Sequence, residues 1–101
     1  MQFLVLAYDG GDDQAKARRA NARPRHFESI QPMVKRGELR AAGPILDDDG
    51  DMIGSVLLAE FPTRAELDAW LAREPYVAEG VWQRIEIKAF RLAVLDGKIT
   101  P

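Results

Sequence analysis

The sequence contains no cysteine and only one histidine, His26, among its 101 residues. The absence of cysteine excludes disulfide bonds, thiolate nucleophiles and cysteine-ligated zinc sites. One histidine is too few for a typical transition-metal site, and Gly10-Gly11 alone does not make a phosphate-binding loop, so we expect no metal and no cofactor. Proton transfer near neutral pH would depend on His26, because histidine is the residue type whose ordinary pKa, roughly 6.5, lies in that range.

The chain also lacks an excess of charge and any apolar run long enough to cross a membrane. Its 14 basic and 16 acidic residues give a formal net charge of −2, which argues against binding to nucleic acid. The first eight residues lack the basic start and cleavage site of a signal peptide, so we expect a cytoplasmic protein that binds neither membrane nor nucleic acid. With 47% hydrophobic residues and no internal repeat, residues 1–101 are predicted to form a single domain.

Six stretches carry the patterns of strands and helices. Pro24 and Pro32 interrupt the longer helical stretch and predict a kink or a restart near Arg23. Gly43-Pro44 predicts an edge position or a bulge in the second strand. In chain order we expect a strand at 2–8, a helix at 12–36, strands at 38–46 and 53–61, a helix from 62 to before 75, a strand at 82–94 and a tail at 95–101.

This order predicts an α+β fold, the ferredoxin-like βαββαβ sandwich, with an antiparallel sheet and two helices on one face. Right-handed crossovers would place the first and third strands in the centre of the sheet. Both alternating faces of the first strand are apolar, with Phe3, Val5 and Ala7 on one face and Leu4, Leu6 and Tyr8 on the other. The two helices can cover only one face, and a monomer would expose the other to water, so we expect a homodimer that packs through the open sheet face.

A helical wheel places Arg19, Arg23 and His26 on the same side of the first helix as the apolar Ile30. Polar groups within an apolar stripe are typical of a pocket lined by that helix. The alternative is a partly exposed histidine at the edge of the helix, with arginine stems that lie over the core. Glu74, just after the second helix, could reach His26, fix its tautomer and raise the basicity of the other ring nitrogen.

An ordered set of short motifs resembles the YciI-like (YCII-related) family over residues 3–92. The motifs are Arg23-x-x-His26, Gly37-x-Leu39-x-x-Ala42-Gly43-Pro44, Glu74-Pro75-Tyr76-x-x-x-Gly80-Val81 and Ile87-Lys88-x-Phe90. The resemblance implies ferredoxin-like protomers that form a dimeric α+β barrel. It also implies an active site made of a histidine–aspartate pair, which maps onto His26 and the residue before Pro75. In this sequence that residue is Glu74, which keeps the charge and adds one methylene group.

Three functions remain open. The first is a small cofactor-independent enzyme, lyase-like or isomerase-like, in which His26 is the general acid/base and Glu74 orients it. The resemblance adds that one group of the family acts as a dehydrochlorinase on a chlorinated hydroxyquinol. The second is a non-catalytic dimeric module that binds a ligand, and the third is a dimeric-barrel monooxygenase. The candidates for binding a small, anionic or aromatic substrate are Arg19, Arg23, Gly43, Pro44 and Tyr76.

Overall fold

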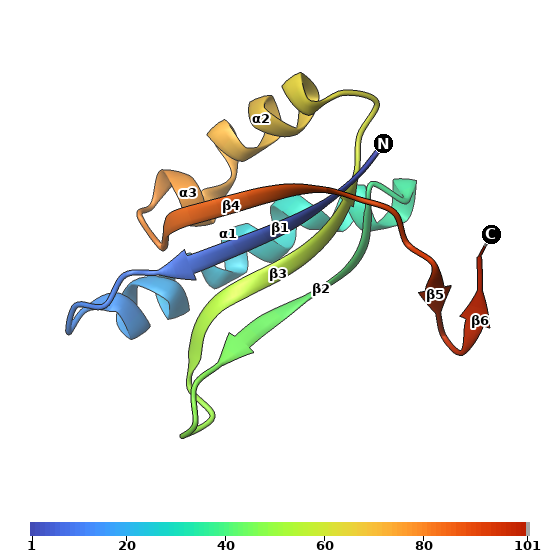
Figure 1. The fold of residues 1–101 in the computed structure, drawn as a ribbon. Helices are drawn as coiled ribbons and strands as arrows, with labels where there is room; N and C mark the ends of the chain where they lie inside the picture. Colours follow the sequence, from blue (N-terminus) through green and yellow to red (C-terminus); the bar gives the residue numbers. More distant parts are fainter. Residues whose placement is uncertain (101) are drawn as a thin grey trace.

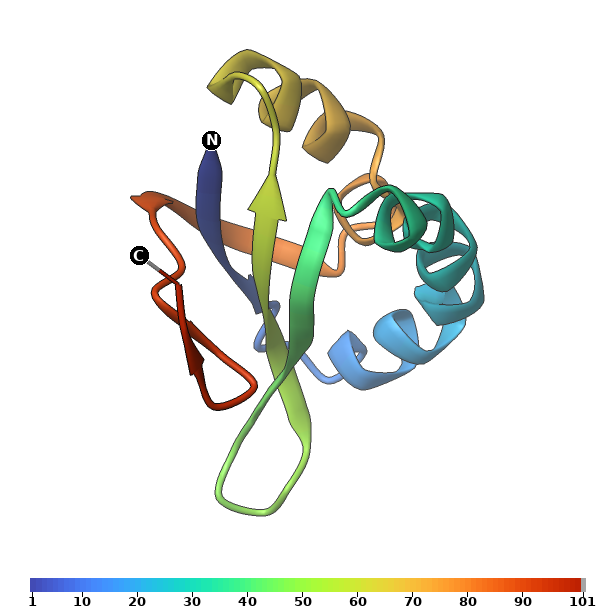
Figure 2. The ribbon, with the colours of Figure 1, turned by 90° about the vertical axis from the view of Figure 1, so that its right-hand side faces the viewer.

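Four strands form one antiparallel sheet, and the helices cover one of its faces (Figures 1 and 2). The computed structural model describes residues 1–100. The strand order is β2-β3-β1-β4, so the two most apolar strands are central and the strand that contains Gly43-Pro44 lies at an edge. The elements are β1 Gln2–Asp9, α1 Ala15–Arg36, β2 Leu39–Leu46, β3 Met52–Glu60, α2 Arg64–Arg73, α3 Pro75–Ala78, β4 Trp82–Phe90, β5 Val94–Leu95 and β6 Lys98–Ile99.

Side-chain alternation in β1 decides which residues face the helices. Phe3, Val5 and Ala7 are at most 3% exposed and lie opposite Ala59, Leu57 and Ser55 of β3. The core forms between this face and apolar residues of the three helices. The other face of β1, with Leu4 and Leu6, is only half-buried in the single chain. The α+β ferredoxin-like architecture expected from the sequence is therefore confirmed.

The long helix α1 continues through both of its prolines. Of the kink or restart predicted near Arg23, the restart is therefore wrong, and the kink stays a prediction. Pro24, Pro32 and the residues four positions before them, Ala20 and Glu28, are all exposed. Water can therefore reach the carbonyl groups that lose a backbone donor, and the helix persists.

The second helical region contains one element more than the sequence predicted. Thr63 caps α2 by accepting a hydrogen bond from the Glu66 backbone N–H at 3.2 Å. Leu67, Trp70 and Leu71 form the buried stripe of α2. After the helix ends, a single further turn, α3, begins at Pro75, a residue suited to the first helical position.

The last strand is shorter than predicted, and the residues expected to be a tail form a hairpin. β4 ends at Phe90, and β5 pairs with β6 around Asp96 and Gly97, which both have positive φ. Asp-Gly is a strong hairpin signal, and it was overlooked here. Figure 2 shows this hairpin and α1 on opposite sides of the sheet. Pro101, the last residue of the expected tail, lies outside the described residues.

Within residues 1–100, no helix has both the length and the apolar character needed to cross a membrane.

Candidate active site

The single histidine lies on the inner side of α1 and contacts the carboxylate of Glu74. His26 Nδ1 and Glu74 Oε1 form a short hydrogen bond between side chains 48 positions apart in the sequence. His26 is 8% exposed and Glu74 is fully buried. The partly exposed helix-edge histidine, the alternative considered from the sequence, is therefore not what the structure contains. With an ionised Glu74 carboxylate, which only accepts, Nδ1–H of a neutral ring is the donor and Nε2 carries the lone pair.

Glu74 is held in place by the junction between α2 and α3. Its backbone is extended, with φ −68° and ψ 130°, the conformation favoured for a residue before proline. Glu74 Oε2 accepts a hydrogen bond of 2.5 Å from the Tyr76 backbone N–H at the start of α3. Both oxygens are therefore engaged, one by the short helix and one by His26. The glutamate side chain, which is longer than that of aspartate, is thus held at both of its carboxylate oxygens.

Two aromatic side chains enclose the imidazole. The Tyr76 ring stacks on His26 with centroids 3.9 Å apart and planes within 7°. Trp82 presents its ring edge-on to His26 at 5.7 Å. Burial raises the pKa of the Tyr76 phenol, although Arg19 and Arg23 oppose the shift. Tyr76 therefore keeps its proton at ordinary pH and packs against the histidine as a neutral ring.

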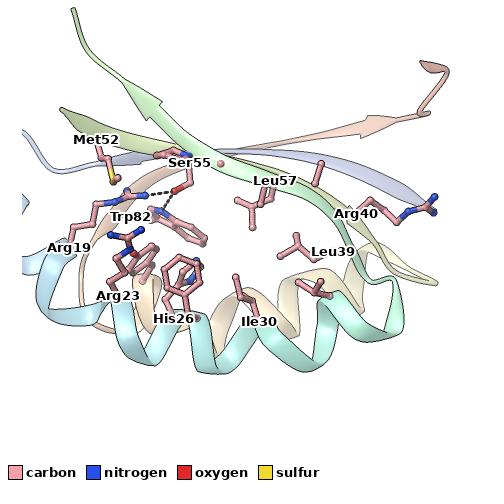
Figure 3. A pocket seen from close by; sticks show the side chains of 17 residues that line it. Arg19, Arg23, His26, Ile30, Leu39, Arg40, Met52, Ser55, Leu57 and Trp82 are labelled. Atoms are coloured by element: carbon pink, nitrogen blue, oxygen red, sulfur yellow. Dashed lines mark hydrogen bonds between the residues drawn. The ribbon is translucent and has the colours of Figure 1, made fainter. Parts of the chain in front are cut away.

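Next to the histidine lies a buried polar cluster that consists of Arg19, Asp9, Ser55 and Trp82. Arg19 Nη1 is 3.0 Å from both carboxylate oxygens of Asp9, and Arg19 Nη2 donates to Ser55 Oγ at 2.9 Å. Trp82 Nε1 donates to the same hydroxyl oxygen at 3.2 Å. Figure 3 shows both bonds meeting at Ser55. The Arg19–Asp9 pair thus fixes the guanidinium against the sheet.

These groups line one end of a cavity of about 360 Å³ between α1 and the β2–β3 edge of the sheet (Figure 3). Arg23 also lines it, is exposed, and has no hydrogen bond or ion pair with any of residues 1–100. Its guanidinium carbon lies 5.1 Å from the centre of the Phe27 ring. The remaining lining is mostly apolar, but it also includes Arg40, whose Nη1 donates to Glu60 Oε2 at 2.7 Å. The apolar part consists of Phe27, Ile30, Val34, Leu39, Ala41, Ala42, Gly43, Pro44, Met52 and Leu57. This shape suits a small ligand with a planar or apolar body and a polar, electron-rich end.

The structure brings all seven site residues predicted from the sequence to this region. His26, Arg19, Arg23, Gly43, Pro44 and Tyr76 line the cavity, while Glu74 lies behind the histidine. Arg19 differs from the expectation in one respect, because Asp9 and Ser55 already bind its guanidinium.

The sequence analysis missed Asp9, Ser55 and Trp82. Trp82 is buried, at 4% exposed, and lines the cavity. Asp9 and Ser55 each occupy an inward position of an otherwise apolar strand, in alternation with Ala7 and Leu57. That break in the pattern was the available signal, because buried polar groups require a partner.

Within residues 1–100, no group of three or more His, Cys, Asp or Glu side chains is placed to hold a metal ion. The chemistry that the described groups can perform themselves is hydrogen bonding, charge attraction and proton transfer at His26.

Comparison with known proteins gives consistent results over most of the chain. The family model of the YCII-related domain matches residues 1–91. Protein YciI of Escherichia coli O6:H1 is 32% identical over 97 residues, which cover 90% of this chain and 97% of that protein. An uncharacterized protein of Haemophilus influenzae is 27% identical over the same shares of the two chains.

Two solved structures share the fold. The first is the 5-chloro-2-hydroxyhydroquinone dehydrochlorinase of Burkholderia phenoliruptrix in complex with 2,5-dihydroxybenzoquinone, with a TM-score of 0.78, 22% identity, and coverage of 90% of this chain and 94% of that chain. The second is an antibiotic biosynthesis monooxygenase, with a TM-score of 0.53, 16% identity, and coverage of 90% and 96%. At these identities the likeness shows the fold alone. The family model and the relatives above show that the chain belongs to the YCII-related domain family.

Proposed function

We propose that the protein is a small enzyme that removes and returns a proton, with His26 as the general acid/base and Glu74 as the group that orients it. The observation that carries this proposal is the His26–Glu74 hydrogen bond at the wall of an accessible cavity. Because Nδ1 is engaged by the carboxylate, Nε2 is the nitrogen left to act on a ligand. The reaction class is lyase-like or isomerase-like.

In this mechanism Nε2 takes a proton from a substrate carbon or hydroxyl, and Glu74 stabilises the imidazolium that forms. The electron pair left behind moves into the substrate. It either expels a leaving group as an anion, which completes an elimination, or is protonated at another atom by the same imidazolium, which completes a tautomerisation. Arg23, exposed at the cavity wall and without an ion-pair partner among residues 1–100, would attract an anionic or phenolic substrate.

The dehydrochlorinase that shares the fold acts on a chlorinated hydroxyquinol, and loss of hydrogen chloride is an elimination of this kind. The electron-rich planar ring of a hydroxyquinol also suits a cavity with mostly apolar walls and a cationic end. This supports an aromatic or enolic substrate for the present protein. The third function considered from the sequence, a monooxygenase, has only the shared fold in its favour.

The partner of the chain is proposed to be a second copy of itself. Leu4, Leu6 and Val56 lie on the sheet face opposite the helices and are only half-buried in the single chain. Packing two such faces together would remove this apolar surface from water, and the fold is the one found in dimeric α+β barrels.

The test measures exchange of carbon-bound hydrogen for deuterium, which detects proton removal even when the complete reaction is unknown. Enolisable ketones and chlorinated quinols are first screened for stabilisation of the wild-type protein against thermal unfolding. Each compound that stabilises it is then followed by NMR in D₂O with wild type, His26→Ala and Lys35→Ala. Lys35 is the control because it is exposed on α1 and does not line the cavity.

We expect wild type and Lys35→Ala to accelerate exchange equally, and His26→Ala to lose about 10²–10⁴-fold of the acceleration. Binding to His26→Ala should remain detectable, because the apolar walls and Arg23 are unchanged. Ligands that bind and exchange at the same rate with wild type and His26→Ala would instead identify a non-catalytic binding module.

A further inference from the structure

The buried hydroxyl group of Ser55 accepts two hydrogen bonds, and its O–H is still available as a donor. A hydroxyl oxygen has two lone pairs and one O–H. Arg19 Nη2 and Trp82 Nε1 occupy the two lone pairs, at 2.9 and 3.2 Å. No acceptor for the Ser55 proton occurs within residues 1–100, although the residue is only 6% exposed. An O–H without an acceptor at such a position is costly, and in this molecule it lies at the cavity wall.

The two donors also change the strength of this hydroxyl group. Arg19 is a cation, and its bond to Ser55 Oγ draws electron density away from the O–H. Asp9 holds Arg19 by a pair whose side chains are 9% and 5% exposed, so the guanidinium cannot easily turn into the cavity itself. The result is a neutral donor of enhanced strength, fixed by the sheet before any ligand arrives.

Ser55 and His26 line the same cavity from opposite elements, β3 and α1 (Figure 3). A ligand between them would meet a proton acceptor, Nε2, from the helix and a proton donor, Ser55 O–H, from the sheet. This pair is complementary to a carbonyl compound or a quinol, in which proton loss places negative charge on an oxygen atom.

We propose that Ser55 binds the substrate oxygen on which negative charge develops, and that Arg19 acts through Ser55 as a positioning residue. The inference rests on the proposed function and specifies its substrate as a carbonyl or phenolic compound. When Nε2 removes a proton next to a carbonyl group, the C–H electron pair forms a C=C bond and the C=O π pair moves to oxygen. The resulting enolate oxygen accepts the hydrogen bond from Ser55, and the proton remains on Nε2 until it is returned.

The test uses 4-nitrophenol as the probe and nitrobenzene as its matched neutral control, because the two differ by the oxygen that Ser55 would bind. Affinities are measured for wild type, Ser55→Ala and Ser55→Thr, and the absorption of 4-nitrophenol reports how much of the bound probe is phenolate. Ser55→Thr keeps the hydroxyl group, and a β-branched residue suits the strand. Circular dichroism confirms that each variant is folded.

Wild type should bind the phenolate better than nitrobenzene, and a larger fraction of bound than of free 4-nitrophenol should be ionised at the same pH. Ser55→Ala should lose about tenfold or more in phenolate affinity, as expected for a hydrogen bond to a charged group, with nitrobenzene binding within about twofold of wild type. Ser55→Thr should restore the phenolate preference.

The inference is overturned if wild type shows no phenolate preference, or if Ser55→Ala weakens both probes equally. If Ser55→Ala does not fold, Arg23→Ala decides the question, because Arg23 also attracts phenolate. An ionised fraction of bound 4-nitrophenol that stays raised without Arg23 supports the inference, and one that falls to the value of the free probe overturns it. Failure of the proposed function has a different signature, since His26→Ala would then leave deuterium exchange unchanged while the Ser55 variants still changed the binding of phenolate.

Discussion

Glu74 has one methylene group more than the aspartate that the family resemblance implies at this position, and the site accommodates it. Its two oxygens reach in two directions, to the Tyr76 backbone N–H and to the His26 ring, and neither is exposed to solvent. Pro75 contributes by holding Glu74 in an extended conformation. The carboxylate is therefore part of the α2–α3 junction as well as of the site.

This double role predicts a stability cost when Glu74 is changed. Glu74→Ala removes both acceptor oxygens, so the Tyr76 backbone N–H and the His26 ring lose their partner. We expect the free energy of unfolding to fall by at least about 1–3 kcal/mol in urea denaturation. Glu74→Gln should cost less, because its oxygen can accept from Tyr76 while the neutral His26 ring changes tautomer and accepts from the amide. A Glu74→Ala protein within about 0.5 kcal/mol of wild type would show that this carboxylate does not satisfy both donors.

At the scale of single elements, α2 has the clearest sequence signal. Thr63 and Glu66 mark its start, and Leu67, Trp70 and Leu71 mark its buried side.

Leu67 is fully buried, so Leu67→Ala should lower the free energy of unfolding by about 2–5 kcal/mol. Trp70→Ala should show a loss of similar size. Asp68→Ala on the exposed side of the same helix is the control, with an expected change within about 0.5 kcal/mol. Equal losses in Leu67→Ala and Asp68→Ala would contradict the assigned helix face.

The pair between Arg25 of α1 and Glu79, which follows α3, joins the two elements that hold His26 and Glu74. Arg25 Nη2 and Nε donate to the Glu79 carboxylate at 2.5 and 2.7 Å. The hydrogen bond from Arg25 lowers the pKa of Glu79. A lowered folded-state pKa adds stability above the ordinary carboxyl pKa, and this stability is lost as pH falls through the folded-state value.

Wild type should therefore be somewhat more stable than Glu79→Gln at neutral pH, and this advantage should shrink on acidification. The effect is modest and should weaken in high salt, because the pair is exposed to solvent. Urea midpoints of the two proteins, measured from neutral to acidic pH, provide the check. An advantage that is constant with pH would mean that the charge of Glu79 is not its source.

Sequence patterns predicted most elements but not the way in which some of them end. A short, nearly continuous apolar run that ends in a turn identified β1, and the proline in β2 correctly indicated an edge strand. The helix restart was wrong because the cost of Pro24 and Pro32 depends on whether water reaches the carbonyl groups, which only the packed structure decides. The turn at Asp96-Gly97 could have been predicted, because Asp-Gly is itself a strong hairpin signal.

Only those parts of the site that lie on one element could be predicted from local sequence patterns. A helical wheel groups Arg19, Arg23 and His26, because these residues lie on one element. The bond from Ser55 to Arg19 joins residues 36 positions apart on different elements, and no local pattern determines which cation meets which hydroxyl group. Glu74 was predicted as a site residue because the loop after α2 can reach α1 and because of the family motif. Its contact with the Tyr76 backbone depends on α3, which the sequence analysis missed.

At the scale of the whole molecule, the open sheet face determines the expected assembly. Light scattering at micromolar concentration should give about twice the mass of the 11.3 kDa chain. Leu6→Glu places a charge on the central strand of that face and should shift the protein toward the monomer. Ala72→Glu, on an exposed position of α2, should leave the dimer intact. A wild-type protein that is monomeric throughout this range would contradict the proposed interface.

The central claim, that Glu74 holds His26 with Nε2 free to act as a base, can be read directly from the only histidine in the chain. Long-range ¹H–¹⁵N correlation spectra of protein labelled with ¹⁵N-histidine distinguish a protonated from a bare ring nitrogen. At mildly alkaline pH we predict a neutral ring with the proton on Nδ1 and none on Nε2, unchanged in Lys35→Ala and lost in Glu74→Ala. A proton on Nε2, or the averaged spectrum of an imidazole exposed to water, would contradict the account.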